Sequence, residues 1–238
     1  MNAHARGAAR AALPFALALF AGTARAEIGA QLSAASEEIF RGRSISSGRP
    51  TFGLDLSYDD AGGAYLGAQA KGVATRDNGL QLLRLTEYGG YAWRVASDLT
   101  VDLGLTNTHY SRYSGLGRDT HYSEVTAGLI GRRLSGRVSL SPNWFGPNNY
   151  TLYGETNATL GDPAGWQVSL HGGVLQWLHG ARPATIPSTR YDARVGVARG
   201  FGPVRGELSW TTGGPRPDYY SGRSHGHGAL VLSASIGL

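Results

Sequence analysis

The stretch Leu99-Thr100-Val101-Asp102-Leu103-Gly104-Leu105-Thr106 alternates apolar and polar side chains without a break. Successive side chains of a β-strand point to opposite faces, so this stretch predicts a strand with one apolar and one polar face. The same alternation recurs in Thr51–Tyr58 and in Leu230–Leu238. The pattern predicts an all-β protein.

Twelve segments of this kind follow one another along the chain. Several extend for about ten residues, which exceeds the five or six residues of most soluble strands and matches the length of a tilted strand that crosses a bilayer. The predicted segments are 30–41, 50–58, 63–72, 80–93, 98–110, 121–131, 134–142, 150–160, 165–176, 189–199, 204–212 and 229–238.

The connections between these segments alternate in length. Short turns are predicted at 59–62, 94–97, 132–133, 161–164 and 200–203, and longer links at 42–49, 73–79, 111–120, 143–149, 177–188 and 213–228. Short turns at one end and long loops at the other are typical of outer-membrane barrels. A secreted β-sandwich would share the alternation, but strand length and loop asymmetry favour a closed antiparallel transmembrane β-barrel with both termini in the periplasm.

Composition excludes several other classes. The chain has no cysteine, so it is not a disulfide-stapled scaffold. Charged residues make up 16% of the chain, against roughly 25% in ordinary soluble domains. The 12 tyrosines and 5 tryptophans argue against a disordered chain. Because no basic stripe is present, nucleic acid is not an expected partner.

The N-terminus predicts export. Arg6 and Arg10 precede a short apolar run at 11–21, and Ala24-Arg25-Ala26 provides a small-x-small cleavage pattern. We therefore expect residues 1–26 to be a signal peptide and residues 27–238 to be an outer-membrane barrel. Three of the arginines lie in this leader, so it contributes much of the net charge of +5.

Aromatic residues and the last strand fit the same architecture. The five tryptophans and several tyrosines fall at or near predicted strand ends, where a barrel collects aromatic rings into two girdles at the membrane surfaces. The chain stops within an alternating segment at Ile236-Gly237-Leu238, with Leu in place of the more usual Phe. Expected partners are therefore outer-membrane lipid and lipopolysaccharide, and the barrel-assembly machinery through this C-terminal strand.

In a barrel the polar faces of the strands point inward. Arg41, at the end of the first segment, is expected to pair with a carboxylate across the barrel, for example Glu124 or Asp192, and the alternative role is that of a solute clamp. Charges of both signs are present, so strong ion selectivity is not expected. The residues predicted to line the lumen are Arg41, Asp55, Asp102, Glu124, Arg137, Glu155, His171, Asp192, Arg194, Arg205 and Glu207.

Seven short motifs follow one another along the chain: Phe40–Ser46 (FRGRSIS), Gly62–Gly67, Glu87–Tyr91, Tyr122–Val125, Ser141–Phe145, His171–Gly173 and Tyr191-Asp192. As an ordered set they resemble the TorF-like porin family of Gram-negative bacteria. The resemblance covers roughly residues 33 to 200, and departs from the family at Ala64, where Phe is usual, and at Asn143, where Asp is usual. The resemblance implies a porin-like protein and does not indicate a particular solute.

Enzymatic chemistry is not predicted. Ser169 and His171 share a face and could be imagined as a hydrolase pair, but no nucleophile motif surrounds them. His225 and His227 are weak metal candidates, since two histidines without a third ligand make a poor site. No cofactor is expected.

Two functions remain from the sequence. One is a porin-like channel for the passive diffusion of small hydrophilic solutes. The other is a closed structural or adhesive barrel that acts through its external loops.

Overall fold

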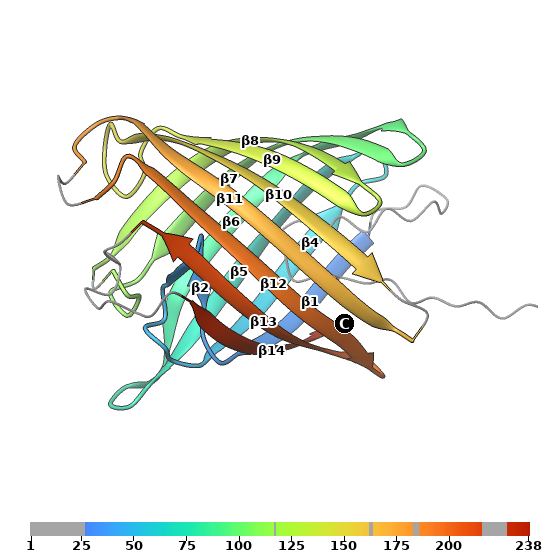
Figure 1. The fold of residues 1–238 in the computed structure, drawn as a ribbon, viewed down its shortest axis with the longest axis horizontal. Coiled ribbons are helices and arrows are strands. Elements are labelled where there is room, and N and C mark those ends of the chain that lie inside the picture. Colours follow the sequence, from blue (N-terminus) through green and yellow to red (C-terminus); the bar gives the residue numbers. More distant parts are fainter. Residues whose placement is uncertain (1–26, 117, 162–163, 183–185, 216–227) are drawn as a thin grey trace, which may run out of the picture.

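The computed structural model describes residues 27–116, 118–161, 164–182, 186–215 and 228–238, which form one closed β-barrel (Figure 1). The described residues contain no helix long and apolar enough to cross a membrane. The predicted fold class and the number of twelve strands are confirmed. The barrel strands are β1 (Glu27–Ala35), β4 (Thr51–Asp59), β5 (Ala64–Thr75), β6 (Gly79–Ala96), β7 (Leu99–Tyr110), β8 (Thr120–Gly131), β9 (Leu134–Ser141), β10 (Tyr150–Gly161), β11 (Trp166–His179), β12 (Thr189–Phe201), β13 (Val204–Gly214) and β14 (Ala229–Gly237).

Every barrel strand runs antiparallel to both neighbours, and the first strand closes the sheet against the last. β1 pairs with β14 through registers such as Leu32 with Ile236, and Leu238 N–H donates to the carbonyl of Ala30 at 2.9 Å. On its other side β1 pairs with β4, ending at Ala35 opposite Thr51. Closure leaves no unpaired sheet edge, which is the condition for a β-structure in lipid.

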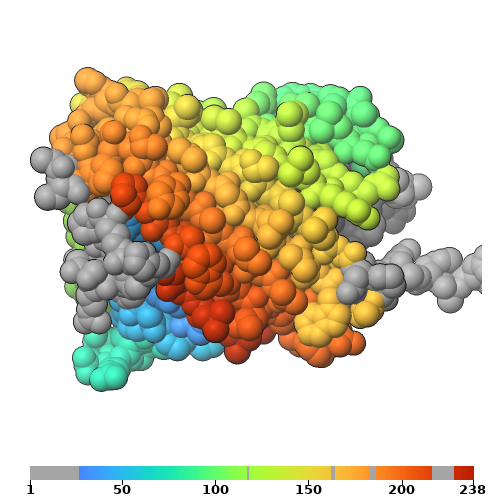
Figure 2. All heavy atoms as spheres, in the orientation of Figure 1, coloured from blue at the N-terminus to red at the C-terminus, as the bar shows by residue number. Residues whose placement is uncertain are grey.

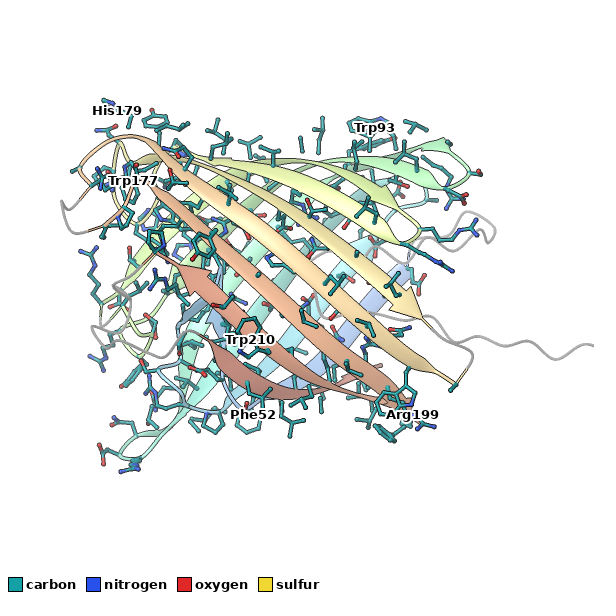
Figure 3. All side chains as sticks on the ribbon, viewed as in Figure 1. Phe52, Trp93, Trp177, His179, Arg199 and Trp210 are labelled. Atoms are coloured by element: carbon teal, nitrogen blue, oxygen red, sulfur yellow. The ribbon has the colours of Figure 1, made fainter. Side chains whose placement is uncertain are left out.

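The outer wall of the barrel is apolar. Side chains such as Leu105 and Leu232, each 63% exposed, cover it on all sides. Figure 2 shows the wall over β10–β14 as a continuous surface without an opening. Trp93 and Trp210, labelled in Figure 3, also lie on the outer wall and are 41% and 46% exposed. Exposed leucine and valine in this number suit a hydrocarbon environment and not water.

Some of the aromatic rings expected in girdles instead face the interior, so that part of the prediction was wrong. Trp144 is 1% exposed, Tyr110 2% and Tyr65 5%. Tyr65 and Tyr110 occupy the inward positions of their strands, because their neighbours Leu66 and His109 point outward. Trp144 lies in a connection that bends over the lumen, where it packs against other rings.

The connections differ in length between the two ends, as predicted, with one exception. The β5–β6 connection is only 76–78, not the longer 73–79 link expected. The Thr75 hydroxyl accepts from Asn78 N–H and donates to the Gly79 carbonyl, and Gly79 has a φ of 65°, so the two strands continue to a tight turn. In Figure 1 the short turns lie to the right, and the long loops and this extended hairpin to the left.

Candidate functional site

The connection between β1 and β4 does not extend outward from the barrel. It forms a small hairpin, β2 (Ile39–Phe40) and β3 (Arg43–Ser44), that folds into the lumen. The prediction that the first strand continues to Arg41 was therefore wrong, because the chain leaves the barrel wall after Ala35. We call residues 36–50 the inward hairpin.

The turn of the inward hairpin needs glycine. Arg41 and Gly42 have φ angles of 46° and 72°, the pair of left-handed conformations that a two-residue type I′ turn requires. A Cβ on Gly42 would lie 2.7 Å from the Asp192 Cβ and 2.8 Å from the Gly213 Cα. The tip of the hairpin therefore crosses the lumen and rests directly on the wall at β12 and β13.

Arg41 fixes this tip to a third part of the wall. Its Nη2 donates to both oxygens of Glu124 on β8, at 2.8 and 3.0 Å, which confirms the expected pairing with a carboxylate across the barrel. The guanidinium also lies over the rings of Tyr153 and Trp144, at 3.8 and 4.7 Å from their centroids. Burial by itself lowers the pKa of Arg41, but the Glu124 carboxylate and the neighbouring tyrosines more than offset it, so the side chain stays charged.

The base of the inward hairpin is held by a second set of charges. Glu38 accepts from Arg84 at 3.1 Å and lies 3.6 Å from Lys71, both on the wall. Ile45 is fully buried, and its carbonyl accepts from Gly115 N–H in the β7–β8 connection at 2.7 Å. The hairpin is thus tied to the wall at base and tip.

The loop end of the lumen holds an apolar core around this hairpin. Aromatic rings dominate this core. The ring of Phe40 stacks on that of Trp144 with 6.0 Å between the ring centroids, and the centroids of Tyr122 and Trp144 are 4.6 Å apart. The buried members are Ile45, Val73, Leu83, Tyr110, Tyr122, Trp144, Tyr153 and Leu175. Because an apolar core excludes water, this end is the narrow part of the lumen.

Below this core lies a polar cavity of about 330 Å³. Arg41, Asp55, Glu124, Arg137, Glu155, His171, Asp192, Arg194, Arg205 and Glu207 are among the residues that line it. Asp102, also predicted in the lumen, points inward but is buried in the wall, where the Tyr65 hydroxyl donates to it at 2.7 Å. The structure thus brings ten of the eleven predicted residues to one cavity.

Charges in the cavity are matched in pairs. Arg194 lies 3.3 Å from Glu207, and Arg137 lies 3.9 Å from Glu155. Asp55 accepts from Tyr88 at 2.8 Å and from Gln69 at 2.9 Å. The lining is therefore hydrophilic without a strong excess of either sign.

His171 is bound by its neighbours in the cavity. Its Nε2 lies 2.7 Å from an Asp192 oxygen and its Nδ1 2.7 Å from the Asn157 side-chain oxygen. Ser169, considered above as a hydrolase partner of His171, is not among these contacts. His225 and His227 lie outside the described residues. Within the residues that are described, no group of three or more His, Cys, Asp or Glu could hold a metal ion.

Three groups of the site were not predicted: Glu38, Arg84 and Tyr153. Glu38 falls on the apolar face of the segment predicted at 30–41, and this mismatch indicates that the strand ends before it. Arg84 follows a β-bulge that shifts the register between Lys71 and Gly72. The apolar positions change phase there, from Leu80 and Leu82 to Leu85, and this change was a usable sign of the bulge.

A bulky residue at the hairpin tip is expected to dislodge the inward hairpin. Gly42→Val places a β-branched side chain at positive φ and against Asp192 and Gly213, so we expect trypsin to cleave the folded protein after Arg41 and Arg43. Gly48→Val is the matched control, since Gly48 also has a positive φ, 73°, but a Cβ added there would meet no atom within 4 Å. Mass spectrometry of the fragments measures the effect, and equal cleavage of both variants would contradict it.

Known proteins share this fold and part of this sequence. No match is found among curated protein sequences. The solved NanC porin superposes with a TM-score of 0.58 at 9% identity, covering 88% of this chain and 99% of that one. The KdgM porin superposes with a TM-score of 0.53 at 10% identity, covering 87% and 98%. At these identities the likeness shows the fold alone, which is that of outer-membrane porins.

The sequence itself matches one family model over residues 21–214, which spans every strand except β14. That family is described as bacterial protein of unknown function (Gcw_chp). The match includes the inward hairpin and nearly all the cavity lining described above. The chain therefore belongs to the Gcw_chp family.

Proposed function

We propose that this protein is a porin-like channel of the outer membrane through which small hydrophilic solutes diffuse. The observation that carries this proposal is the polar cavity of about 330 Å³ inside a closed sheet whose outer wall is apolar. A passive channel needs a hydrophilic lumen that binds nothing too tightly. The resemblance of the ordered motifs to TorF-like porins supports the same assignment.

The proposed placement has the barrel spanning the outer membrane with both termini in the periplasm. Support comes from the short turns, which outer-membrane barrels keep on the periplasmic side, and from the even number of strands. On this placement the inward hairpin lies at the external end, where it is the constriction that a solute meets first. The signal peptide predicted at 1–26 remains a prediction.

Planar-bilayer recording of the refolded full mature chain tests the proposal. We expect discrete, voltage-independent conductance steps after insertion. The same sample must show heat-modifiable migration on a gel, so that a silent recording reflects a closed barrel and not unfolded protein. Folded protein that never conducts would contradict the channel and support the second candidate.

The second candidate is a closed barrel that acts through its external loops. It is favoured by one observation, the apolar core that packs around the inward hairpin at the loop end. In this case the cavity would be a water pocket below a plug, and binding of the loops to an external surface would persist without any conductance.

Weak ion selectivity is a further expected result. The cavity lining carries Arg41, Lys71, Arg84, Arg137, Arg194 and Arg205 against Glu37, Glu38, Asp55, Glu124, Glu155, Asp192 and Glu207. Because most of these are paired, the field along the path is small, and we expect a potassium-to-chloride permeability ratio within about threefold of one. The reversal potential in a potassium chloride gradient measures this ratio. A reversal potential close to the equilibrium potential of potassium or of chloride would contradict weak selectivity.

A further inference from the structure

The outer wall of the barrel carries a polar cluster where lipid would be expected. It lies across β6, β7 and β8, and we call its members, Glu87, Asn107, His109, His121 and Ser123, the outer-wall cluster. The Asn107 side-chain amide donates to Glu87 at 3.3 Å and lies 2.7 Å from the His109 Nε2, and its oxygen accepts from Ser123 at 3.1 Å. The rings of His109 and His121 lie 5.6 Å apart.

Glu87 points outward within the apolar band. On its strand Leu85 and Tyr91 share its face, while Thr86 and Tyr88 point inward. Glu87 lies six positions before Trp93, which marks the short-turn end of the outer wall in Figure 3. For a tilted strand this is a height of roughly 15 Å within an apolar band about 25 Å tall.

A carboxylate at this depth is costly if it faces lipid alone. Ionisable side chains at membrane depth almost always face protein or water and mark functional positions. Among the described strand residues, Glu87 is the one acidic side chain on the outward face with apolar neighbours on both sides along its strand. The single amide of Asn107 satisfies only part of its hydrogen-bonding capacity.

The wall beside the cluster carries small side chains. Ala68 lies directly opposite Glu87 on β5, Ala70 lies opposite Leu85, and Gly89 follows on β6. Small side chains let two membrane-embedded surfaces approach closely. Small outward residues alone do not mark this face, since Gly136, Thr156, Gly172 and Ala193 form a similar row across β9–β12, but no acidic side chain accompanies them on the outward face there.

We propose that this face, the outer-wall cluster together with Ala68, Ala70 and Gly89, is where a second copy of the chain packs in the membrane. The face carries both an acceptor, Glu87, and donors, the Asn107 amide and the imidazoles, so it is complementary to itself about a twofold axis. Packing removes the carboxylate from lipid and gives it further donors. An anionic lipid headgroup fits less well, since the carboxylate would repel its phosphate.

Cysteine crosslinking tests this packing, because the natural chain contains no cysteine. The Ala68→Cys variant is reconstituted in lipid vesicles and oxidised, and we expect a crosslinked dimer on a denaturing gel. Leu208→Cys is the matched control, since Leu208 is 48% exposed on β13, across the barrel from β7. Light scattering of the wild type in detergent is expected to give the mass of two chains.

The role of the cluster is then tested by Glu87→Lys and Glu87→Gln in the Ala68→Cys background. We expect Glu87→Lys to reduce the crosslinked fraction at least tenfold, because it replaces the acceptor of the face by a cationic donor beside the Asn107 amide and the imidazoles. Glu87→Gln keeps an acceptor oxygen and is expected to retain the crosslink. Heat-modifiable migration checks that each variant is folded. A single-chain mass, or equal crosslinking at Ala68→Cys and Leu208→Cys, would overturn the proposal. These readouts do not involve conductance, so they stand apart from the channel test.

Discussion

Removing the inward hairpin is expected to raise the conductance of the barrel several-fold while leaving the twelve-stranded sheet intact. Ala35 and Thr51 lie directly opposite each other at the ends of β1 and β4, so an Asn-Gly turn can replace residues 36–50 and join the two strands. The replacement removes Ile45 and Phe40 from the apolar core and the Arg41 contact from Glu124. Nothing in the barrel wall itself is cut.

Single-channel recording measures this effect, and a heat-modifiable gel confirms that the variant is folded. Replacing 76–78 by Asn-Gly is the matched control, because it shortens a turn whose residues are exposed and lie away from the cavity lining. We expect the control to keep the wild-type conductance. A folded hairpin deletion that conducts no better than the control would show that the hairpin is not the constriction.

Arg41→Ala is expected to destabilise the protein more than any other single change to a charged residue at the hairpin. Arg41 and Glu124 are 11% and 7% exposed, and their pairing lies against aromatic rings. Removing one partner of a buried ion pair leaves an uncompensated charge, at a cost of about 3–5 kcal/mol. Replacing both, as in Arg41→Met with Glu124→Leu, removes that charge and is expected to recover most of the loss.

The midpoint of urea unfolding in lipid vesicles measures these differences. Arg132→Ala is the matched control, since Arg132 pairs with Asp98 at 2.6 Å but the two side chains are 75% and 57% exposed. An exposed pair of this kind contributes less than about 1 kcal/mol. If Arg41→Ala costs no more than Arg132→Ala, the Glu124 contact does not hold the hairpin in place.

The barrel could be predicted from the sequence because its wall is governed by local alternation. Each outward Leu or Val fixes the direction of its neighbours, so residues such as Asp55 and Glu155 could be assigned to the interior one strand at a time. The same reasoning placed nine wall residues around a single cavity, whereas Arg41, the tenth, reaches the cavity from the inward hairpin. It worked because a closed sheet has only two faces.

The inward hairpin could not be predicted in this way. Most of its residues are polar, like those of an external loop, and alternation gives no information on which way a loop bends. The contact that decides the direction joins Arg41 to Glu124 across 83 positions of the chain. The sequence suggested this pairing, but with Arg41 on the wall at the end of the first strand and not at the tip of a connection that folds inward. Trp144 was misplaced for the same reason, because a loop tryptophan beside a strand end suits a membrane girdle and an interior core equally well.

The extended β5–β6 hairpin offers a place to attach foreign sequence. Its strands are 12 and 18 residues long, and in Figure 1 its teal tip projects at the lower left, to the side of the other loops. Residues 76–80 are all exposed, and the ladder between Thr75 and Gly79 keeps the stem regular up to the turn. On the proposed placement in the outer membrane, a peptide epitope inserted at 76–78 would therefore be exposed outside the cell, which makes this hairpin a natural anchor for antibody labelling or display on intact cells.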